Sequence, residues 1–364
     1  MVTTPSAGDL ASVVNLLDFE RLARTRMEPA AFEFVAGGAG DETSLAEALE
    51  AWRRYRFVPR VLVDVRRIDL RGRFLEREAT LPIGIAPMAG QAMAHPDAEA
   101  AMVRGAGAAG LPMILSTSAS LSLEAVAEAG PTTDRLFQLY LVGDLGYTRS
   151  LVERAAAAGY RAIVLTVDLP VLGYRDRDRR SGFGLPPMPM VDGSRGTAAE
   201  AREDRYAGLD RQRELGLTWD TLAEIQTWSD LPLVLKGVLS PADARLAVET
   251  GAAAVIVSTH GARQIDRVIA SADALGGVVE AIGGRAEVWV DGGIRRGIDV
   301  AVALALGADA VLIGRPFFWA LAAGGQAGVE RAASILREEL EIGLALLGCT
   351  SIGDLGPALL VQGA

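Results

Sequence analysis

Short apolar runs recur along the chain between longer alanine-rich segments. Eight of these runs, several rich in β-branched residues, predict β-strands at residues 81–87, 113–118, 135–141, 162–168, 232–238, 253–259, 287–293 and 310–316. The intervening segments, such as 240–251 and 296–307, place small and apolar residues at spacings of three and four and end in glycine. That pattern is typical of helices, so the sequence predicts a regular alternation of strands and helices.

Eight strand–helix units predict an α/β fold of the (β/α)8 or TIM-barrel type. Parallel neighbouring strands need crossover helices, which the helix-like segments supply. A doubly wound sheet is the alternative, but eight units within about 235 residues favour a closed barrel.

Two regions depart from this alternation of strands and helices. Residues 1–80 contain two or three helix-like segments before the first strand, and they predict an N-terminal helical cap on the barrel. Residues 172–215 form a long polar insertion after the fourth strand, with Pro, Gly and many charges, as in lid-like or disordered loops. No linker marks a second domain, so we expect residues 1–364 to form a single domain.

Composition narrows the possible functions. Half of the 364 residues are apolar and 5% are aromatic, which suits a core of Ala, Val, Leu and Ile. The net charge of −10 argues against a nucleic-acid partner, and the single cysteine, Cys349, excludes a disulfide within the chain and a multi-cysteine metal site. No apolar run approaches the roughly 18 residues of a membrane span, and the N-terminus lacks the basic segment of a secretion signal. We therefore expect a cytoplasmic protein without a metal or a membrane partner.

Polar residues collect at the carboxyl ends of the predicted strands, which form the functional face of a barrel. The residues at these ends are Met88-Ala89 beside Pro87, Ser116, Ser118, Gln138, Tyr140, Thr166, Asp168, Lys236, Ser258, His260, Asp291, Gly293, Gly314 and Arg315, with Arg175, Arg263 and Arg295 close behind. Each has a structural alternative: Asp168 and Asp291 could cap helices, and His260 could be a hydrogen-bonded rim residue. Lys236, however, is the only lysine among 36 basic residues, which favours a chemical role.

Two groups on this face suggest ligands. Glycine turns after the last two strands, followed by helix starts, are typical of a phosphate site, with Arg315 as the cation. Tyr140, Arg175, His260 and Arg263 combine a phenol, a base and two cations, which suits a small anionic substrate that carries a hydroxyl.

Together these residues resemble the FMN-dependent 2-hydroxy acid oxidases and dehydrogenases, which include glycolate oxidases, lactate oxidases and mandelate-type enzymes. The likeness covers about residues 17 to 347 and rests on PIGIAPMAGQAMAHP, LFQLY, LTVDLPVLGYR, LVLKGV, STHGARQID, DGGIRRG and IGRPFFWA. It implies FMN at the rim of the barrel, a 2-hydroxy acid and O2 as small-molecule partners, and a homotetramer or homo-octamer.

The resemblance also implies roles for individual residues. His260 corresponds to the active-site base and Asp168 to the carboxylate that orients it, while Arg263, Arg175 and Tyr140 correspond to the groups that hold the substrate. The expected FMN contacts are Met88, Ala89, Ser116, Gln138, Thr166, Lys236, Ser258, Asp291, Gly293, Arg295, Gly314 and Arg315. A positive Lys236 would stabilise the anionic reduced flavin.

Three departures from the family pattern bear on the substrate. Phe34 stands where the family commonly has a tyrosine that bonds the substrate carboxylate, and Ser118 stands where glycolate oxidases have a tryptophan. Both changes, with Leu172 nearby, predict a larger and more apolar pocket than that of glycolate oxidases. Thr259 replaces the usual asparagine before the histidine, whereas Ala89 matches the oxidase-like members.

The sequence thus predicts oxidation of an (S)-2-hydroxy acid, aryl or branched and mandelate-like, to the 2-oxo acid, with O2 giving H2O2. Either hydride transfer or a carbanion route fits the residues. A dehydrogenase that passes electrons to a quinone or cytochrome is the alternative within the family. An FMN-dependent isomerase is a further alternative, but it makes poor use of His260, Arg263 and Arg175. The intact motifs disfavour a catalytically idle barrel that acts as a binding or assembly protein.

Overall fold

A closed barrel of eight parallel strands forms the centre of the molecule in this computed structural model, which describes residues 10–193 and 216–363. The barrel strands follow one another in chain order, and the last, β11, pairs with the first, β4. They are β4 (Ile83–Ile85), β5 (Met113–Ser116), β6 (Arg135–Leu139), β7 (Ile163–Thr166), β8 (Leu233–Lys236), β9 (Ala254–Val257), β10 (Glu287–Asp291) and β11 (Ala310–Ile313). All eight predicted strands and the predicted barrel closure are confirmed.

Successive side chains of each barrel strand point alternately into the barrel and toward the helices, and both of these surroundings are apolar. In β5, Ile114 points into the barrel interior, whereas Met113 and Leu115 pack against the surrounding helices. The same alternation places Ile256 of β9 inside and its neighbours outside. A strand buried on both faces reads as a continuous apolar run, which is why the sequence located these strands so well.

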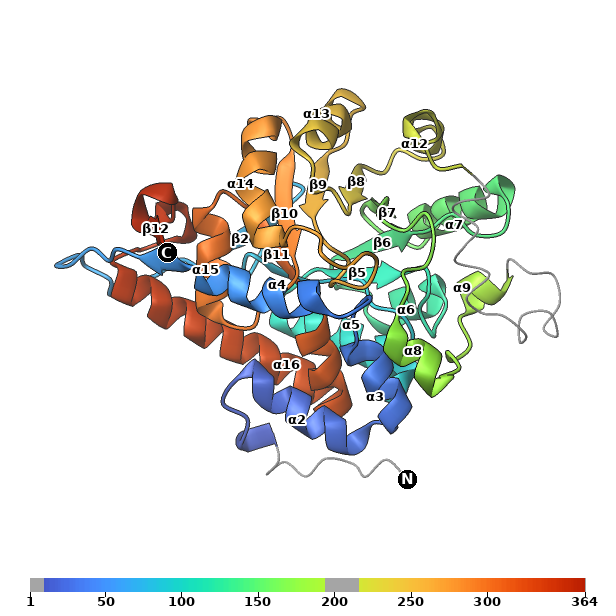
Figure 1. The fold of residues 1–364 in the computed structure, drawn as a ribbon, viewed down its shortest axis with the longest axis horizontal. Coiled ribbons are helices and arrows are strands. Elements are labelled where there is room, and N and C mark those ends of the chain that lie inside the picture. The colour runs from blue at the N-terminus through green and yellow to red at the C-terminus, as the bar shows by residue number, and fades with distance from the viewer. Residues whose placement is uncertain (1–9, 194–215, 364) are drawn as a thin grey trace.

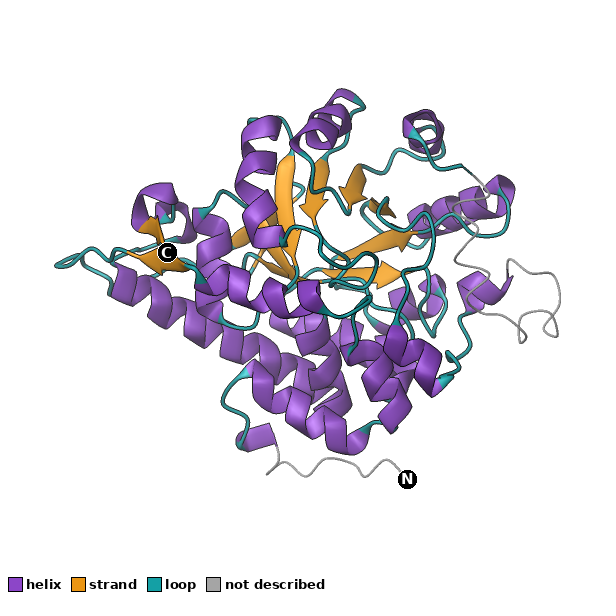
Figure 2. Cartoon of the chain, viewed as in Figure 1, coloured by secondary structure: helices purple, strands orange, loops and turns teal. Residues whose placement is uncertain are grey.

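Helices surround the barrel on its outside (Figure 2). They are α5 (Ala98–Ala109), α6 (Leu123–Ala129), α7 (Leu145–Ala157), α12 (Trp219–Gln226), α13 (Pro241–Glu249), α14 (Ser271–Ile282), α15 (Gly297–Ala305) and α16 (Arg315–Leu347), with the short η1 (Gln91–Met93) before α5. Helix α16 is interrupted at Gly324 and Gly325, whose backbone angles are not helical. Each barrel strand therefore leads through its loop to a covering helix.

The N-terminal segment supplies α2 (Leu16–Arg26), α3 (Pro29–Ala36) and α4 (Thr43–Arg53), which lie beside α16 and across one end of the barrel (Figure 1). Outside the barrel, β1 (Tyr55–Phe57) pairs with β12 (Leu360–Gln362), and β2 (Gly72–Phe74) pairs with β3 (Arg77–Ala79). Phe74 joins the barrel interior, where its ring lies 5.1 Å from that of Trp289. Two short 3-10 helices, η3 (Ile352–Asp354) and η4 (Pro357–Leu359), precede β12.

The predicted insertion 172–215 begins with α8 (Asp176–Ser181) and α9 (Pro189–Asp192). Helix α8 packs against α3 of the N-terminal segment. Residues 194–215 of the insertion lie outside the described residues, so its lid-like role stays a prediction, as does the single-domain organisation.

Candidate active site

Residues at the carboxyl ends of the barrel strands line a cavity together with α3 and the start of the insertion. The cavity encloses about 1250 Å³ of empty space, part of it open to solvent.

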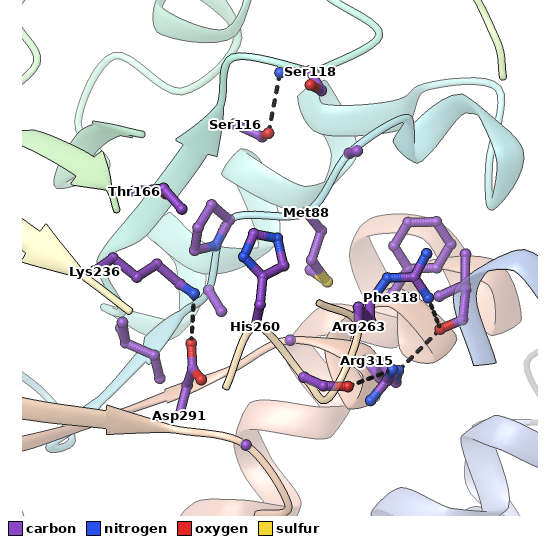
Figure 3. Close-up of a pocket in the computed structure, with 18 of the residues that line it drawn as sticks. Met88, Ser116, Ser118, Thr166, Lys236, His260, Arg263, Asp291, Arg315 and Phe318 are labelled. Atoms are coloured by element: carbon purple, nitrogen blue, oxygen red, sulfur yellow. Dashed lines mark hydrogen bonds and ion pairs between the residues drawn. The ribbon is translucent and has the colours of Figure 1, made fainter. Parts of the chain in front are cut away.

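Most of the predicted site residues meet in this cavity (Figure 3). They are Phe34, Met88, Ala89, Ser116, Ser118, Tyr140, Thr166, Leu172, Arg175, Lys236, His260, Arg263, Asp291, Gly293, Arg295, Gly314 and Arg315. Three predicted residues lie behind the lining and contact it instead. Asp168 bonds His260, Gln138 bonds Ser116 and Thr166, and Ser258 bonds Lys236.

Sequence reasoning missed several apolar lining residues. Leu169 follows β7, Phe318 lies in the first turn of α16, and Leu185 and Met188 come from the insertion. The last two belong to an apolar stretch, LPPMPM, within an otherwise charged segment. Such a stretch in a polar loop was the signal that could have identified them as pocket residues.

His260 lies between two hydrogen-bonding partners. Its Nδ1 is 2.8 Å from Oδ1 of Asp168, and its Nε2 is 3.2 Å from the hydroxyl of Tyr140. Because a carboxylate only accepts, Nδ1 carries the proton and Nε2 presents its lone pair toward the cavity side. The contact between Asp168 and the histidine thus selects the tautomer that a base at Nε2 requires.

Burial and neighbouring charges set the protonation states of His260, Asp168 and Tyr140. It lowers the pKa of His260, against the opposing charge of Asp168, so that the imidazole is neutral at pH 7. Burial alone would raise the pKa of Asp168, but its contact with His260 and the charge of Lys236 hold that pKa below its usual value. Burial also raises the pKa of Tyr140, so its phenol stays protonated.

The backbone that carries His260 makes an unusual turn. His260, Gly261 and Ala262 have φ values of 56°, 65° and 60°, three left-handed residues in succession. Such a conformation is strained for the two non-glycine residues and is held by neighbouring hydrogen bonds. The Oγ of Ser258 accepts from the His260 N–H at 3.0 Å, and Oγ1 of Thr259 accepts from the Ala262 N–H at 3.2 Å. Thr259 therefore closes the turn that carries His260.

Two arginines lie beside the histidine. Nη1 of Arg263 donates to the carbonyl oxygens of Phe34 and Gly37 at 2.7 and 2.8 Å, and its Cζ lies 4.9 Å from the centre of the Phe34 ring. Nε of Arg175 donates to the Arg263 carbonyl at 2.9 Å. The buried carboxylate of Asp178 lies 3.6 Å from Arg175 and 4.0 Å from Arg263. These contacts fix both guanidinium groups at the cavity wall, where they can bind a carboxylate.

Lys236 occupies the floor of the cavity at the end of β8. Its ammonium group lies 2.8 Å from Oγ of Ser258 and 3.2 Å from a carboxylate oxygen of Asp291. Figure 3 marks the ion pair with Asp291. The lysine side chain is 5% exposed, so its charge acts in a medium that water screens poorly. It is therefore suited to stabilise negative charge on a group bound above it.

Arg295 and Arg315 mark a second polar corner of the cavity. Arg315 donates to the carbonyl oxygens of Val35, Gly37 and Gly261, each at 2.9 Å, and no carboxylate lies within ion-pair distance of either arginine among the described residues. Burial lowers the pKa of Arg295 and lowers that of Arg315 to about 9. Two partly buried cations that no described carboxylate pairs with make a site for an anion.

The adjacent glycine turn also packs against the N-terminal helices. Gly293 has φ 79°, and a Cβ at this position would come within 1.9 Å of the Ala48 carbonyl oxygen. The carbonyl of Gly292 accepts a hydrogen bond of 2.8 Å from Nε1 of Trp52. Besides the predicted approach of backbone to an anion, the glycine is therefore required for the close approach of α4.

The chain is similar to known proteins over almost its whole length. A family model described as FMN-dependent dehydrogenase matches residues 23–362. The chain is 48% identical over 360 residues to an L-lactate oxidase of Nostoc sp., covering 96% of this chain and 99% of the relative. It is 44% identical over 348 residues to a glycolate oxidase of Spinacia oleracea, covering 94% of each chain.

Solved structures of a mandelate oxidase superpose on almost the whole chain. One of them has a TM-score of 0.87 and 41% sequence identity, and the match covers 97% of this chain and 100% of the other. A structure of mandelate oxidase with (S)-4-hydroxymandelic acid matches with a TM-score of 0.89 at 41% identity and the same coverage.

Proposed function

Because the chain belongs to the FMN-dependent 2-hydroxy acid oxidase family, we propose that it oxidises an (S)-2-hydroxy acid larger than glycolate, with an aryl or branched side chain. The product is the 2-oxo acid, and O2 is the electron acceptor and becomes H2O2. The observation that carries this proposal is one cavity in which the base His260, the cations Arg175 and Arg263, and the small side chain of Ser118 meet.

FMN is the cofactor of the family, and the residues of this chain fit it. Arg295 and Arg315, which no described carboxylate pairs with, suit the phosphate of FMN. Gly293 and Gly314 line the same cavity. Lys236 and Asp291 suit the polar edge of the flavin ring. The further ring contacts are assigned as in the sequence analysis, to Met88, Ala89, Ser116, Gln138, Thr166 and Ser258. When bound, FMN supplies the acceptor for the two electrons that leave the substrate.

The residues of the chain hold the substrate and move its proton. Arg175 and Arg263 bind the carboxylate, which places the α-carbon and its hydroxyl near Nε2 of His260. That nitrogen accepts a proton from the substrate, and the imidazolium that forms is stabilised by Asp168 at 2.8 Å. The protonated Tyr140 hydroxyl, 3.2 Å from Nε2, donates a hydrogen bond near the reacting oxygen.

The wall of the cavity supports the larger substrate. Phe34 places an apolar ring where a hydroxyl would otherwise bind the substrate, and Leu172, Leu185 and Met188 extend the apolar surface. Ser118, which is 2% exposed, leaves space that a larger side chain would fill. A glycolate molecule would leave this surface without a partner.

Anaerobic mixing of the FMN-loaded protein with 2-hydroxy acids tests the proposal. We expect flavin absorbance to bleach faster with (S)-mandelate than with glycolate or lactate, and more slowly with (R)-mandelate. His260→Gln is expected to keep FMN bound but to lose bleaching by substrate. Glycolate as the best substrate, or undiminished bleaching in the variant, would overturn the proposal. Admission of air then identifies the acceptor, since an oxidase reoxidises rapidly and a dehydrogenase that uses a quinone or cytochrome does not.

The assembly and the cellular location remain predictions. No helix in the described part of the chain is long and apolar enough to cross a membrane. Val61 and Leu62 are 80% and 103% exposed on the loop after β1, and Leu346 is 73% exposed at the end of α16. The Arg60 N–H bonds the Leu347 carbonyl, so the two segments that carry these exposed side chains run next to each other. They favour the predicted homotetramer, which size-exclusion chromatography with light scattering would test.

A further inference from the structure

A buried carboxylate, that of Asp178, lies between the two arginines of the cavity wall. Its Oδ2 is 3.6 Å from Nη1 of Arg175 and 4.0 Å from Nη2 of Arg263, and its side chain is 6% exposed. No other described group hydrogen-bonds either oxygen of Asp178, so the two guanidinium groups are its partners. Burial raises the pKa of Asp178, whereas the charges of Arg263 and Arg175 oppose that shift and favour the ionised carboxylate.

Asp178 lies behind the arginines as seen from the cavity. Among the described residues, Arg175 and Arg263 line the cavity and Asp178 does not. A substrate carboxylate that binds the arginines from the cavity therefore shares both cations with the carboxylate of Asp178. Like charges repel strongly where water screens them poorly, so Asp178 weakens the attraction of this wall for an anion.

Helix α8 sets the position of Asp178 independently of the arginines in the cavity wall. The preceding residue, Arg177, forms ion pairs with Glu33 of α3, at 2.6 Å, and with Glu42. The helix also packs against α3. We therefore expect α8 to stay docked when the charge of Asp178 is removed.

The two arginines have neutral partners that keep them in place. Nε of Arg175 donates to the Arg263 carbonyl at 2.9 Å, and its Nη2 donates to Oε1 of Gln264 at 3.0 Å. Nη1 of Arg263 donates to the carbonyl oxygens of Phe34 and Gly37. A neutral side chain in place of the aspartate would thus change the charge of the wall more than its geometry.

From these contacts we infer that Asp178 is a positioning residue that limits the charge of the carboxylate-binding wall. Two arginines and one aspartate leave a single net positive charge among these three side chains, which matches one carboxylate. The 2-oxo product carries the same carboxylate as the substrate, so a wall of limited charge binds the substrate and still releases the product. This inference rests on the proposed function, in which Arg175 and Arg263 bind the substrate carboxylate, and it names the residue that sets the affinity of that site.

Two ligands that differ in charge test the inference in the FMN-loaded protein. Phenylacetate has the carboxylate and ring of an aryl 2-hydroxy acid but no hydroxyl to oxidise, and phenylacetamide is its neutral counterpart. Titration of the flavin absorbance spectrum gives the Kd of each. In Asp178→Asn, which keeps the shape of the side chain, Kd for phenylacetate should fall about five- to tenfold, and Kd for phenylacetamide should change by less than about twofold. The 2-oxo product should inhibit steady-state turnover more strongly by the same factor as phenylacetate.

Asp176→Asn is the matched control. It makes the same change on the same helix, where the carboxylate pairs with Arg180 and is 36% exposed, so neither Kd should change. Flavin absorbance reports whether each variant is folded and loaded, and Asp178→Ser supplies the same comparison if Asp178→Asn does not fold. An unchanged or higher Kd for phenylacetate, or an equal change for both ligands, overturns the inference alone. Failure of both ligands to perturb the flavin of the unmodified protein, with no bleaching by any 2-hydroxy acid, overturns the proposed function and the inference with it.

Discussion

Replacement of Asp168 by asparagine isolates the electrostatic contribution of the carboxylate to the base. Oδ1 of Asp168 lies 2.8 Å from Nδ1 of His260, and the two side chains are 15% and 19% exposed. Asparagine has the same shape and keeps an oxygen that can accept from Nδ1. The substitution therefore removes a negative charge while it leaves the packing and the hydrogen bond possible.

The separation of these groups gives the expected size of the effect. Two unit charges 2.8 Å apart attract by about 6 kcal/mol at an effective dielectric constant of about 20. Because some water reaches both side chains and the asparagine dipole remains, we take about half of this, or about 3 kcal/mol, as the loss of imidazolium stabilisation. Flavin reduction by substrate should then slow by about 100-fold.

Stopped-flow measurement of flavin bleaching without oxygen checks this value. The pH profile provides a second signature, since the reaction needs neutral His260 and its rate should fall as the pH drops through the pKa of that residue. Asp168 raises the pKa of His260 against the effect of burial, so Asp168→Asn should move the acid limb to lower pH. Asp144→Asn, at the exposed N-cap of α7, makes the same chemical change away from the site and should alter neither quantity. A rate within threefold of the unmodified protein, or an acid limb that moves to higher pH, would refute the reasoning.

Three further variants test other parts of the site. Phe34→Tyr adds a hydroxyl on the side of the cavity where the ring contacts Arg263. In steady-state assays it should lower KM for 2-hydroxy acids by about three- to tenfold. An unchanged KM would contradict the assigned position of the substrate carboxylate. Gly293→Ala places a Cβ against the α4 backbone and should strongly reduce FMN retention on gel filtration, whereas Gly284→Ala has a similar φ but no atom within 4 Å and should retain FMN. Lys236→Met leaves the buried carboxylate of Asp291 without its cation, so the free energy of unfolding measured in urea should fall by about 3–5 kcal/mol. A loss below about 1 kcal/mol would show that the Lys236–Asp291 pair is not buried as described.

The sequence by itself determined the barrel and the chemical character of its rim. Strands such as 253–259 could be located because a buried parallel strand is apolar on both faces, a property of neighbouring residues alone. The groups at strand ends could be placed together because parallel strands of a closed barrel end at one rim. The sequence alone therefore places His260, Lys236 and Arg175 in one site.

Only the tertiary structure decided how these groups are held and which surfaces complete the cavity. Arg315 bonds carbonyl groups of residues 35 and 37, some 280 positions earlier in the chain, a contact that no local pattern contains. Leu185 and Met188 line the cavity because the insertion folds back over the rim, although the surrounding sequence is charged. The Ser118 hydroxyl likewise has no hydrogen-bond partner in the described part of the chain, which its local sequence does not reveal. Local periodicity encodes strands and helices, whereas hydrogen-bond satisfaction depends on every segment that packs nearby, and it is settled only when the chain has folded.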